Sequence, residues 1–417
     1  MSLIPNGFMR TILASVTTAI IATAPTQSIA QDMSPETDAW LKANALGSYS
    51  DGSEDWDDIV AKATAEGEVV IYSSSGRIAK LKDHFEALYP GITLTLFDLG
   101  SVKTIEKTVR EQDAGIYNVD VITTGNSGQV IHELLGKGRI FNYVPAHYVD
   151  RIPVENRDPL LIRVNEAIVF FYNTGANPDG PPITNVWQLT LPEFKGKVGI
   201  KNPMSSGSSL MGLATLVQHP DEMAAAYKRL TGEDIVLGDG VPDAGYEFVA
   251  RLLANDLVIF KSGSKLADAA GKAGQDDALI AFTNMTYISR NEAKGNVNAI
   301  ISELDPASKM VYPTFTSVAA QAPHPNAAKL FTAYLLGNID INSDTTIAKP
   351  YLEGTSFDLL QGLAPYHDAG SVSPRSDVPL PEGGEIWDEM KGWSVSDTFM
   401  WEQGPKLRDF WLLQSSQ

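Results

Sequence analysis

Three polar turns hold the side chains best suited to chemistry in this sequence, and each precedes a stretch with helical spacing. The first residues of a helix offer unpaired backbone N–H groups and the positive end of the helix dipole, which together attract anions. An arginine beside such a turn can hold a carboxylate or phosphate through two parallel hydrogen bonds. The candidate ligand-binding residues of these turns are Ser73, Ser74, Ser75, Arg77, Gly125, Asn126, Ser127, Ser205, Ser206 and Ser208.

Two such turns that face each other across a cleft would enclose a small anionic or polyhydroxy ligand. The alternative for each single turn is an ordinary helix N-cap, which stabilises its helix by about 1 kcal/mol and binds nothing else. Capping and ligand binding use the same side chains, so both interpretations stay open for each turn.

Two asparagines and a tyrosine near strand ends are further candidates for the ligand site. Asn173 follows the apolar run 167–172, while Asn284 and Tyr287 follow the run 278–282. An amide can donate and accept at once, and a phenol can stack on a ligand, donate to it or bind a hard cation as phenolate. Packing is the alternative for Tyr287, which we expect to be a metal ligand only if the protein binds iron.

Enzymatic machinery is not visible in the sequence. The six histidines lack metal-ligand spacing, and no His-Glu-x-x-His, Gly-x-Ser-x-Gly, phosphate-binding P-loop or dinucleotide-binding glycine pattern occurs. We therefore expect no catalytic residue, no cofactor and no enzymatic activity. The rival hypothesis is a secreted serine hydrolase that uses the segment 205–209, which would require a general base beside a serine.

Short strands alternating with helices must position these turns. This alternation predicts parallel sheets with helices on both faces and ligands at the carboxyl ends of the strands. Pro313 in the extended run 312–319 indicates an edge or crossover strand, and we expect terminal helices around 387–393 and 406–411. In the first half the predicted strands are 69–72, 92–97 and 120–123, and the predicted helices are 78–88, 102–112 and 130–135.

Composition and charge exclude several classes of protein. The 417 residues include 43% hydrophobic residues, enough for two or three domains with their own cores. The absence of cysteine excludes disulfides, thiolate metal sites and a lipid-anchoring cysteine. A formal net charge of -19 disfavours nucleic acid or an anionic membrane as partner.

The N-terminus predicts export. Residues 1–30 combine one basic residue, an apolar stretch too short to span a membrane, and small residues at a cleavage site, as in a secretory signal peptide. Its removal would leave 31 basic and 51 acidic residues. We interpret 31–58 as a polar leader with one or two helices.

Six segments occur in the order found in one protein family. The chain resembles the extracellular solute-binding proteins of bacterial ABC importers, in the branch that includes ferric-iron, thiamine, phosphonate and sugar-phosphate binders. The matching segments are Glu68–Ser74, Asp120–Ile122, Phe171–Thr174, Phe194–Val198, Pro323–Phe331 and Ser373–Asp377.

This resemblance implies an α/β, two-lobed type II periplasmic binding fold (Venus-flytrap) with a ligand cleft between the lobes. It implies a soluble periplasmic protein, expected to be a monomer, that delivers a small-molecule ligand to an ABC transporter permease in the inner membrane. We expect lobe 1 to comprise 59–166 and 313–417, and lobe 2 to comprise 167–312.

The resemblance is incomplete at the position where iron-binding members place two adjacent tyrosines, because this chain has Thr286 and Tyr287 there. Glu166 and Ile168 also stand where those members often carry basic residues before the strand end. We therefore predict an organic anion, such as a phosphorylated or carboxylated metabolite, as the ligand. A ferric-iron or iron-chelate binding protein is the alternative.

Overall fold

The computed structural model describes residues 33–338 and 360–416. The predicted signal peptide, residues 1–30, lies outside the described residues, whereas the polar leader is described from residue 33 onward. In the described part of the chain, no helix is both long and apolar enough to cross a membrane.

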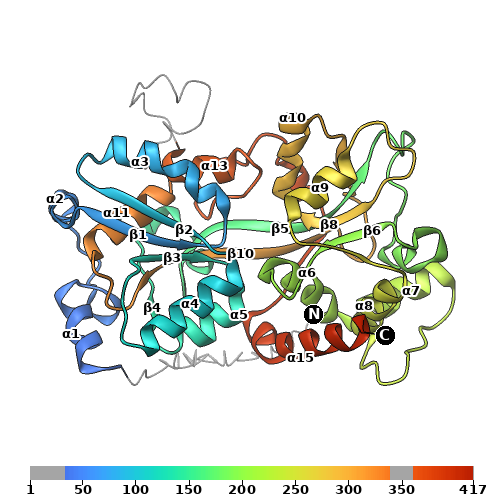
Figure 1. Cartoon of the computed structure of the whole chain (residues 1–417), viewed down its shortest axis with the longest axis horizontal. Coiled ribbons are helices and arrows are strands. Elements are labelled where there is room, and N and C mark those ends of the chain that lie inside the picture. Colours follow the sequence, from blue (N-terminus) through green and yellow to red (C-terminus); the bar gives the residue numbers. More distant parts are fainter. Residues whose placement is uncertain (1–32, 339–359, 417) are drawn as a thin grey trace, which may run out of the picture. The chain divides into compact units, whose positions relative to one another are not determined.

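A single mixed sheet of eleven strands organises the described residues (Figure 1). Its main path runs β2-β1-β3-β10-β5-β8-β6-β7, with β4 and β11 pairing with β10 and β9 pairing with β5. The strands are β1 (Glu68–Ser73), β2 (Thr93–Asp98), β3 (Val121–Thr124), β4 (Ile140–Phe141), β5 (Ile162–Asn173), β6 (Val198–Lys201), β7 (Val258–Phe260), β8 (Ile280–Asn284), β9 (Asn298–Ile300), β10 (Lys309–Ala319) and β11 (Gly392–Ser394).

Two long strands, β5 and β10, join the two ends of the sheet. They pair antiparallel from Lys309 opposite Val169 to Phe315 opposite Ile162. Beyond this shared stretch β10 pairs with β3, while β5 pairs with β8. The chain is therefore two-lobed: one lobe is built on β1, β2 and β3, the other on β6, β7 and β8.

Pro313 confirms the prediction of a crossover strand. It lies between the part of β10 that pairs with β11 and the part that pairs with β3, so β5 is its one strand neighbour in the described structure. Proline has no N–H to donate, and this is the stretch of β10 where one side needs no ladder bond.

In each lobe, helices cover both faces of the sheet, as the alternation of strands and helices in the sequence predicts. The helix predicted at 102–112 is α4, one residue longer at each end, because its buried residues recur at helical spacing. The α-helices are α1 (Pro35–Ala43), α2 (Trp56–Glu66), α3 (Lys82–Leu88), α4 (Ser101–Asp113), α5 (Ser127–Gln129), α6 (Gly207–Val217), α7 (Pro220–Thr231), α8 (Ala244–Ala254), α9 (Gly263–Gly271), α10 (Arg290–Lys294), α11 (Pro325–Leu335), α13 (Ala364–His367), α14 (Glu385–Glu389) and α15 (Asp397–Ser415).

Short helices of other types fill several connections. Segment η3 (Val130–Leu135) is a π-helix that continues α5. The 3₁₀ segments are η1 (Gly47–Tyr49), η2 (Gly76–Leu81), η4 (Ala146–Arg151), η5 (Val154–Asn156), η6 (Val186–Thr190), η7 (Pro192–Phe194), η8 (Met285–Ser289) and η10 (Gln361–Leu363).

The C-terminal segment contacts both lobes. Helix α15 packs against α5 in one lobe and against α6 and α8 in the other. The prediction of a helix over 387–393 was wrong in its second half, because Trp393 lies in β11 and pairs with Met310. The predicted lobe boundaries themselves stay a prediction.

One buried carboxylate holds together three elements at the base of the first lobe. Asp120 is fully buried and accepts hydrogen bonds from the Val70 amide at 2.7 Å, the His324 amide at 2.7 Å and His324 Nδ1 at 2.9 Å. It thereby joins β1 and β3 to the start of α11. The hydrogen bond to Asp120 raises the pKa of His324, although burial opposes the shift.

This pair predicts pH-dependent stability. The folded-state pKa of His324 is raised, so its stabilisation is fully present below the ordinary histidine pKa of about 6.5 and is lost as pH rises through the raised value. We expect His324→Asn to lower the free energy of unfolding by about 1–2 kcal/mol near pH 6 and by less at pH 9. Urea denaturation at both pH values measures this, and a difference that does not change with pH contradicts the assignment.

Candidate functional site

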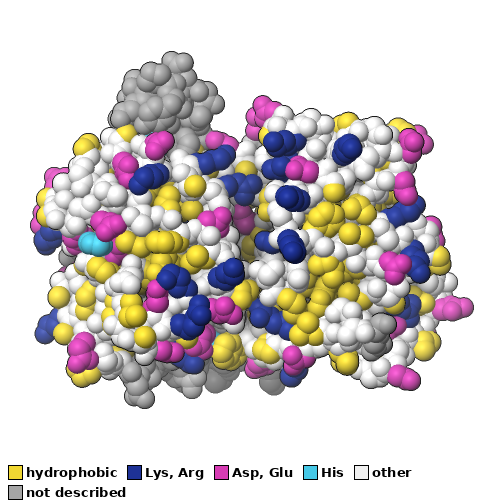
Figure 2. Space-filling view, viewed as in Figure 1, with side chains coloured by type: hydrophobic (Ala, Val, Ile, Leu, Met, Phe, Trp, Pro, Cys, Tyr) yellow, Lys and Arg dark blue, Asp and Glu magenta, His cyan; other side chains and the backbone are white. Residues whose placement is uncertain are grey.

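A cavity of about 740 Å³ lies between the two lobes, next to β5 and β10. Figure 2 shows Lys and Arg side chains on both sides of a hollow between the lobes. Residues from both lobes line the cavity, and so do residues of the segment 365–369. A volume of this size suits a small organic molecule.

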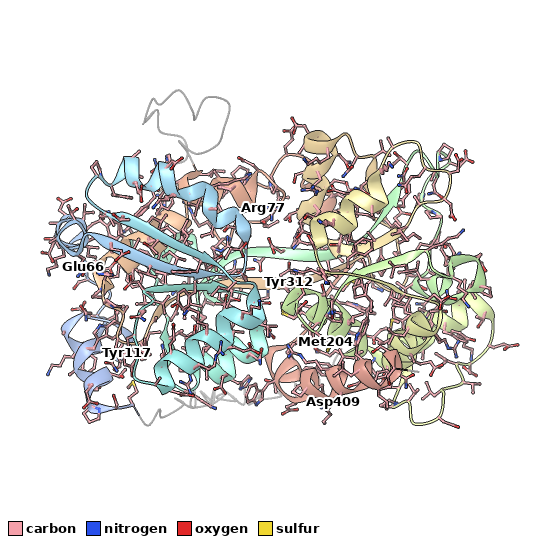
Figure 3. The ribbon with its side chains drawn as sticks, viewed as in Figure 1. Glu66, Arg77, Tyr117, Met204, Tyr312 and Asp409 are labelled. Atoms are coloured by element: carbon pink, nitrogen blue, oxygen red, sulfur yellow. The ribbon has the colours of Figure 1, made fainter. Side chains whose placement is uncertain are left out.

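Arg77 reaches from the first lobe to the second. It follows Ser75, the N-cap of η2, whose hydroxyl accepts from the Arg77 amide at 3.4 Å. Its guanidinium Nη2 donates to Thr286 Oγ1 at 3.1 Å and to the Thr286 carbonyl at 3.4 Å. Figure 3 shows Arg77 close to the junction of the lobes, where Tyr312 also lies.

Three helices, α4, α6 and α9, begin at the cavity, and residues of their first turns line it. None of the three carries an acidic residue in its first turn. Helices α1, α2, α7 and α15 do carry acids there, and the carboxylate of Glu66 accepts from the first amides of α11. The positive helix ends are therefore left without carboxylates where they face the cavity.

The first turns of α4 and α6 touch across the lobes. The Gly207 amide donates to Ser101 Oγ at 2.9 Å. A Cβ at Gly207 would lie 2.9 Å from both Ser101 Oγ and Asn126 Cβ, so glycine is what permits this approach. Beside it, the hydroxyls of Ser206, Ser208 and Ser209 form a chain of hydrogen bonds, each 3.2 Å long.

Basic side chains outnumber acidic ones around the cavity. Burial lowers the pKa of Lys201, and the charge of Asp98 opposes that shift. The Lys201 ammonium makes no ion pair within 4.0 Å in the described structure, whereas Arg290 forms a salt bridge with Asp268. The basic lining residues are Arg77, Lys80, Arg163, Lys201 and Arg290, and the acidic ones are Asp98, Glu166 and Asp368.

Glu166 on β5 is the centre of a hydrogen-bond network that ties the crossing strands to β8. Its carboxylate accepts from Asn284 Nδ2 at 3.0 Å, Tyr312 OH at 2.7 Å and Ser371 Oγ at 3.1 Å. Burial, followed by the charge of Glu166, raises the pKa of Tyr312 well above its ordinary value. Asn284 also donates to the Tyr312 hydroxyl and accepts from the Thr286 amide at 2.8 Å.

The cavity contains oxygen atoms that could bind a hard cation. Within residues 33–338 and 360–416, no group of three or more His, Asp or Glu side chains could hold a metal ion. Glu166, Tyr287 and Tyr312 line one cavity. Burial raises the pKa of Tyr287, and the positive charge of Arg77 opposes this shift only in part. The Tyr287 phenol is therefore neutral unless a cation binds to it.

A family model described as bacterial extracellular solute-binding protein matches residues 61–339, about two thirds of the chain. The chain belongs to this family. The match confirms the resemblance inferred from the sequence. No curated protein sequence matches the chain.

Solved structures share the fold of this solute-binding protein. Iron-bound HitA from Pseudomonas aeruginosa aligns with a TM-score of 0.61 at 15% identity, over 83% of this chain and 99% of HitA. The substrate binding protein of an ABC transporter from Agrobacterium tumefaciens aligns with a TM-score of 0.60 at 13% identity, over 84% and 94%. An iron- and citrate-bound FutA (IdiA) protein from Trichodesmium gives 0.54 at 15% identity, over 84% and 100%. At these identities the likeness supports the two-lobed type II fold.

Eight of the thirteen residues predicted to bind ligand in this solute-binding protein line the cavity. They come from all three polar turns, from the end of β8 and from η8. These residues are Ser74, Ser75, Arg77, Gly125, Ser206, Ser208, Asn284 and Tyr287.

The other five bond to the chain itself outside the cavity lining. Ser73 Oγ accepts from the Ser75 amide, Asn126 donates to Gln129, and the Ser127 hydroxyl contacts Met211 Sδ at 3.9 Å. Ser205 is exposed and donates to the Asn202 carbonyl. Asn173 donates to the carbonyls of Ala270 and Lys272 at the far end of β5.

Sequence reasoning missed many of the other lining residues, among them Arg163, Glu166, Lys201 and Tyr312. Arg163 and Glu166, with Asn165, interrupt an otherwise apolar run, 160–172, most of which forms the central strand β5. A charge in a buried strand is costly unless it is paired or used, so this interruption was the available signal.

The contact between α4 and α6 predicts that bulk at Gly207 opens the cleft. Gly207→Val should push Ser101 and Asn126 away and separate the lobes. Small-angle X-ray scattering should then show a larger radius of gyration than for the unchanged protein. Ser208→Ala in the same turn is the matched control, and an unchanged radius in Gly207→Val contradicts the contact.

Proposed function

We propose that this solute-binding protein captures a small organic anion between its lobes in the periplasm and presents it to the permease of an ABC importer. The single observation that carries the proposal is the charge of the cavity. Five basic and three acidic side chains line it, and three helices open onto it with acid-free first turns. The chain as a whole has a net charge of -19, so this local excess of positive charge runs against the overall composition.

Capture requires contacts from both lobes at once. Arg77 and Ser101 come from the first lobe, while the residues that they contact, Thr286 and Gly207, belong to the second. A ligand bound between them adds further contacts that exist only when the lobes are together. Ligand binding would therefore shift the population towards the closed form, which is the form that docks on the permease.

The cavity favours binding over hydrolysis. The serine hydroxyls at the start of α6 bond to one another, and no imidazole is among the described residues that line the cavity. A serine needs an adjacent base to act as a nucleophile. We accordingly propose a non-enzymatic carrier. From the sequence we further propose that it is a monomer and that it has no nucleic-acid partner, the latter because of its net charge of -19.

A thermal-shift screen tests the ligand class. Phosphate monoesters, phosphonates, dicarboxylates, thiamine and ferric citrate are the probes, because ligand binding raises the melting temperature with the ratio of concentration to Kd. We expect an organic anion to raise it without being turned over. Arg77→Gln should weaken binding of that anion about tenfold or more, since it removes a charged hydrogen-bond donor. Stabilisation by thiamine, a cation, alone, or turnover of the anion, contradicts the proposal.

Glu166, Tyr287 and Tyr312 in one cavity favour ferric iron as the second candidate. Iron coordinated by a phenolate produces a visible charge-transfer band. If iron is the ligand, the ferric complex should be red-violet, and Tyr287→Phe should abolish the band. A colourless protein after ferric citrate treatment excludes this candidate.

A further inference from the structure

Arg163 occupies a β-bulge in the strand that both lobes share. Ile162 pairs with Phe315 and Val164 with Thr314, so two consecutive residues of β10 oppose three of β5. Arg163 is the extra residue. A bulge turns a side chain away from the direction that regular alternation would give it, and here the Arg163 side chain lines the cavity.

The Arg163 guanidinium is buried and has no hydrogen-bond partner in the described structure. The residue is 2% exposed, and its Nε and Nη1 atoms are both unsatisfied. Its Cζ atom lies 3.7 Å from the ring centroid of Tyr366, so one face is covered by an aromatic ring. A guanidinium stays protonated in proteins, and a buried charge without a partner is strongly unfavourable. The folded chain thus holds a positive charge that a bound anion would neutralise.

A second guanidinium lies near the same tyrosine. Arg77 and Arg163 line the same cavity. Burial raises the pKa of Tyr366, while the charges of Arg163 and Arg77 lower it. Helix α13, which carries Tyr366, packs against η2, which carries Arg77. Neither arginine has a carboxylate within 4.0 Å in the described residues. The nearby Glu166 already accepts from Asn284, Tyr312 and Ser371.

The number of donors distinguishes between kinds of anion. A carboxylate has two oxygens, which one guanidinium can satisfy through a bidentate pair. A phosphoryl group has three strong acceptor oxygens and close to two negative charges. Two guanidinium groups and the Ser75 hydroxyl therefore match a phosphoryl group better than a carboxylate.

We propose that Arg163 and Arg77, together with the hydroxyl of Ser75, bind the phosphoryl group of a phosphorylated organic ligand, while the Tyr366 ring supports the Arg163 guanidinium. This inference rests on the proposed function and names the chemical class of its ligand. The cavity of about 740 Å³ is much larger than a single phosphate, so the organic part of the ligand occupies the remainder. Lys201 and the serines of α6 line that remainder.

Isothermal titration calorimetry of the full mature chain tests the assignment. The probes are glycerol 3-phosphate, glucose 6-phosphate, phosphonoacetate, inorganic phosphate, succinate and citrate. We expect at least one phosphorylated organic probe to bind more tightly than inorganic phosphate. Arg163→Met should weaken binding of this probe about 100-fold or more, because the charge and all the N–H donors of the guanidinium are lost. Arg163→Lys should restore only part of the affinity, because an ammonium keeps the positive charge but lacks the planar set of N–H donors of a guanidinium.

Two controls separate ligand binding from a structural role. Unliganded Arg163→Met should melt no lower than the unchanged protein, since it removes an unpaired buried charge and keeps the side-chain volume. Arg229→Met removes an exposed arginine that pairs with Asp305, and it should leave ligand binding unchanged. A melting temperature lowered by several degrees in Arg163→Met would mean that the arginine is structural and would overturn the inference.

The remaining outcomes separate this inference from the proposed function. Tight binding of succinate or citrate that does not depend on Arg163 overturns the phosphoryl assignment and leaves the organic-anion function standing. Binding of inorganic phosphate alone also overturns it. If none of the six probes binds, both the assignment and the organic-anion function fail.

Discussion

The antiparallel pairing of β5 with β10 is the constraint on which the rest of the structure depends. These two strands run through both lobes, and every other strand is joined to one of them either directly or through intervening strands. Arg163 and Glu166 are carried by β5, and Tyr312 and Thr314 by β10, all of them lining the cavity. The floor of the cavity is therefore made of the same residues that join the lobes. A ligand on this floor contacts the connection itself as well as the two walls.

The charge of the cavity is opposite in sign to the net charge of the chain. The chain carries a strong net negative charge, yet its cavity has more basic than acidic side chains and three positive helix ends. At physiological salt the screening length is about 8 Å, so the negative surface and the positive cavity act on an anion at different distances. The field of the whole protein does not steer an anion inward. The proposed capture of an anion would therefore depend on short-range hydrogen bonds and on the low dielectric of the closed cleft.

Local signals predicted much of the fold and part of the site. The polar turns at 73–77 and 205–209 precede helices, and residues of both reach the cavity, because strand ends and helix starts share one edge in α/β folds. Asn173 lies elsewhere because β5 runs antiparallel to β8, so its carboxyl end points away from the cavity. Arg163 depends on a bulge opposite Phe315, about 150 residues later, and local pattern carries no information on such a pairing. Trp393 is in a strand for a similar reason, since its partner is Met310.

Helix α15 adds a third connection between the lobes. Near its start, Gly128 of α5 lies so close to the backbone of Met400 and Trp401 that a Cβ would clash. Near its end, Phe410 packs edge-on against Tyr246 of α8. Wide separation of the lobes must break one of these contacts and expose apolar surface to water, which is unfavourable. Helix α15 therefore opposes separation of the lobes. Because it favours the closed form of the protein, it lowers the free-energy cost of closing the lobes around a ligand, although the ligand does not contact it.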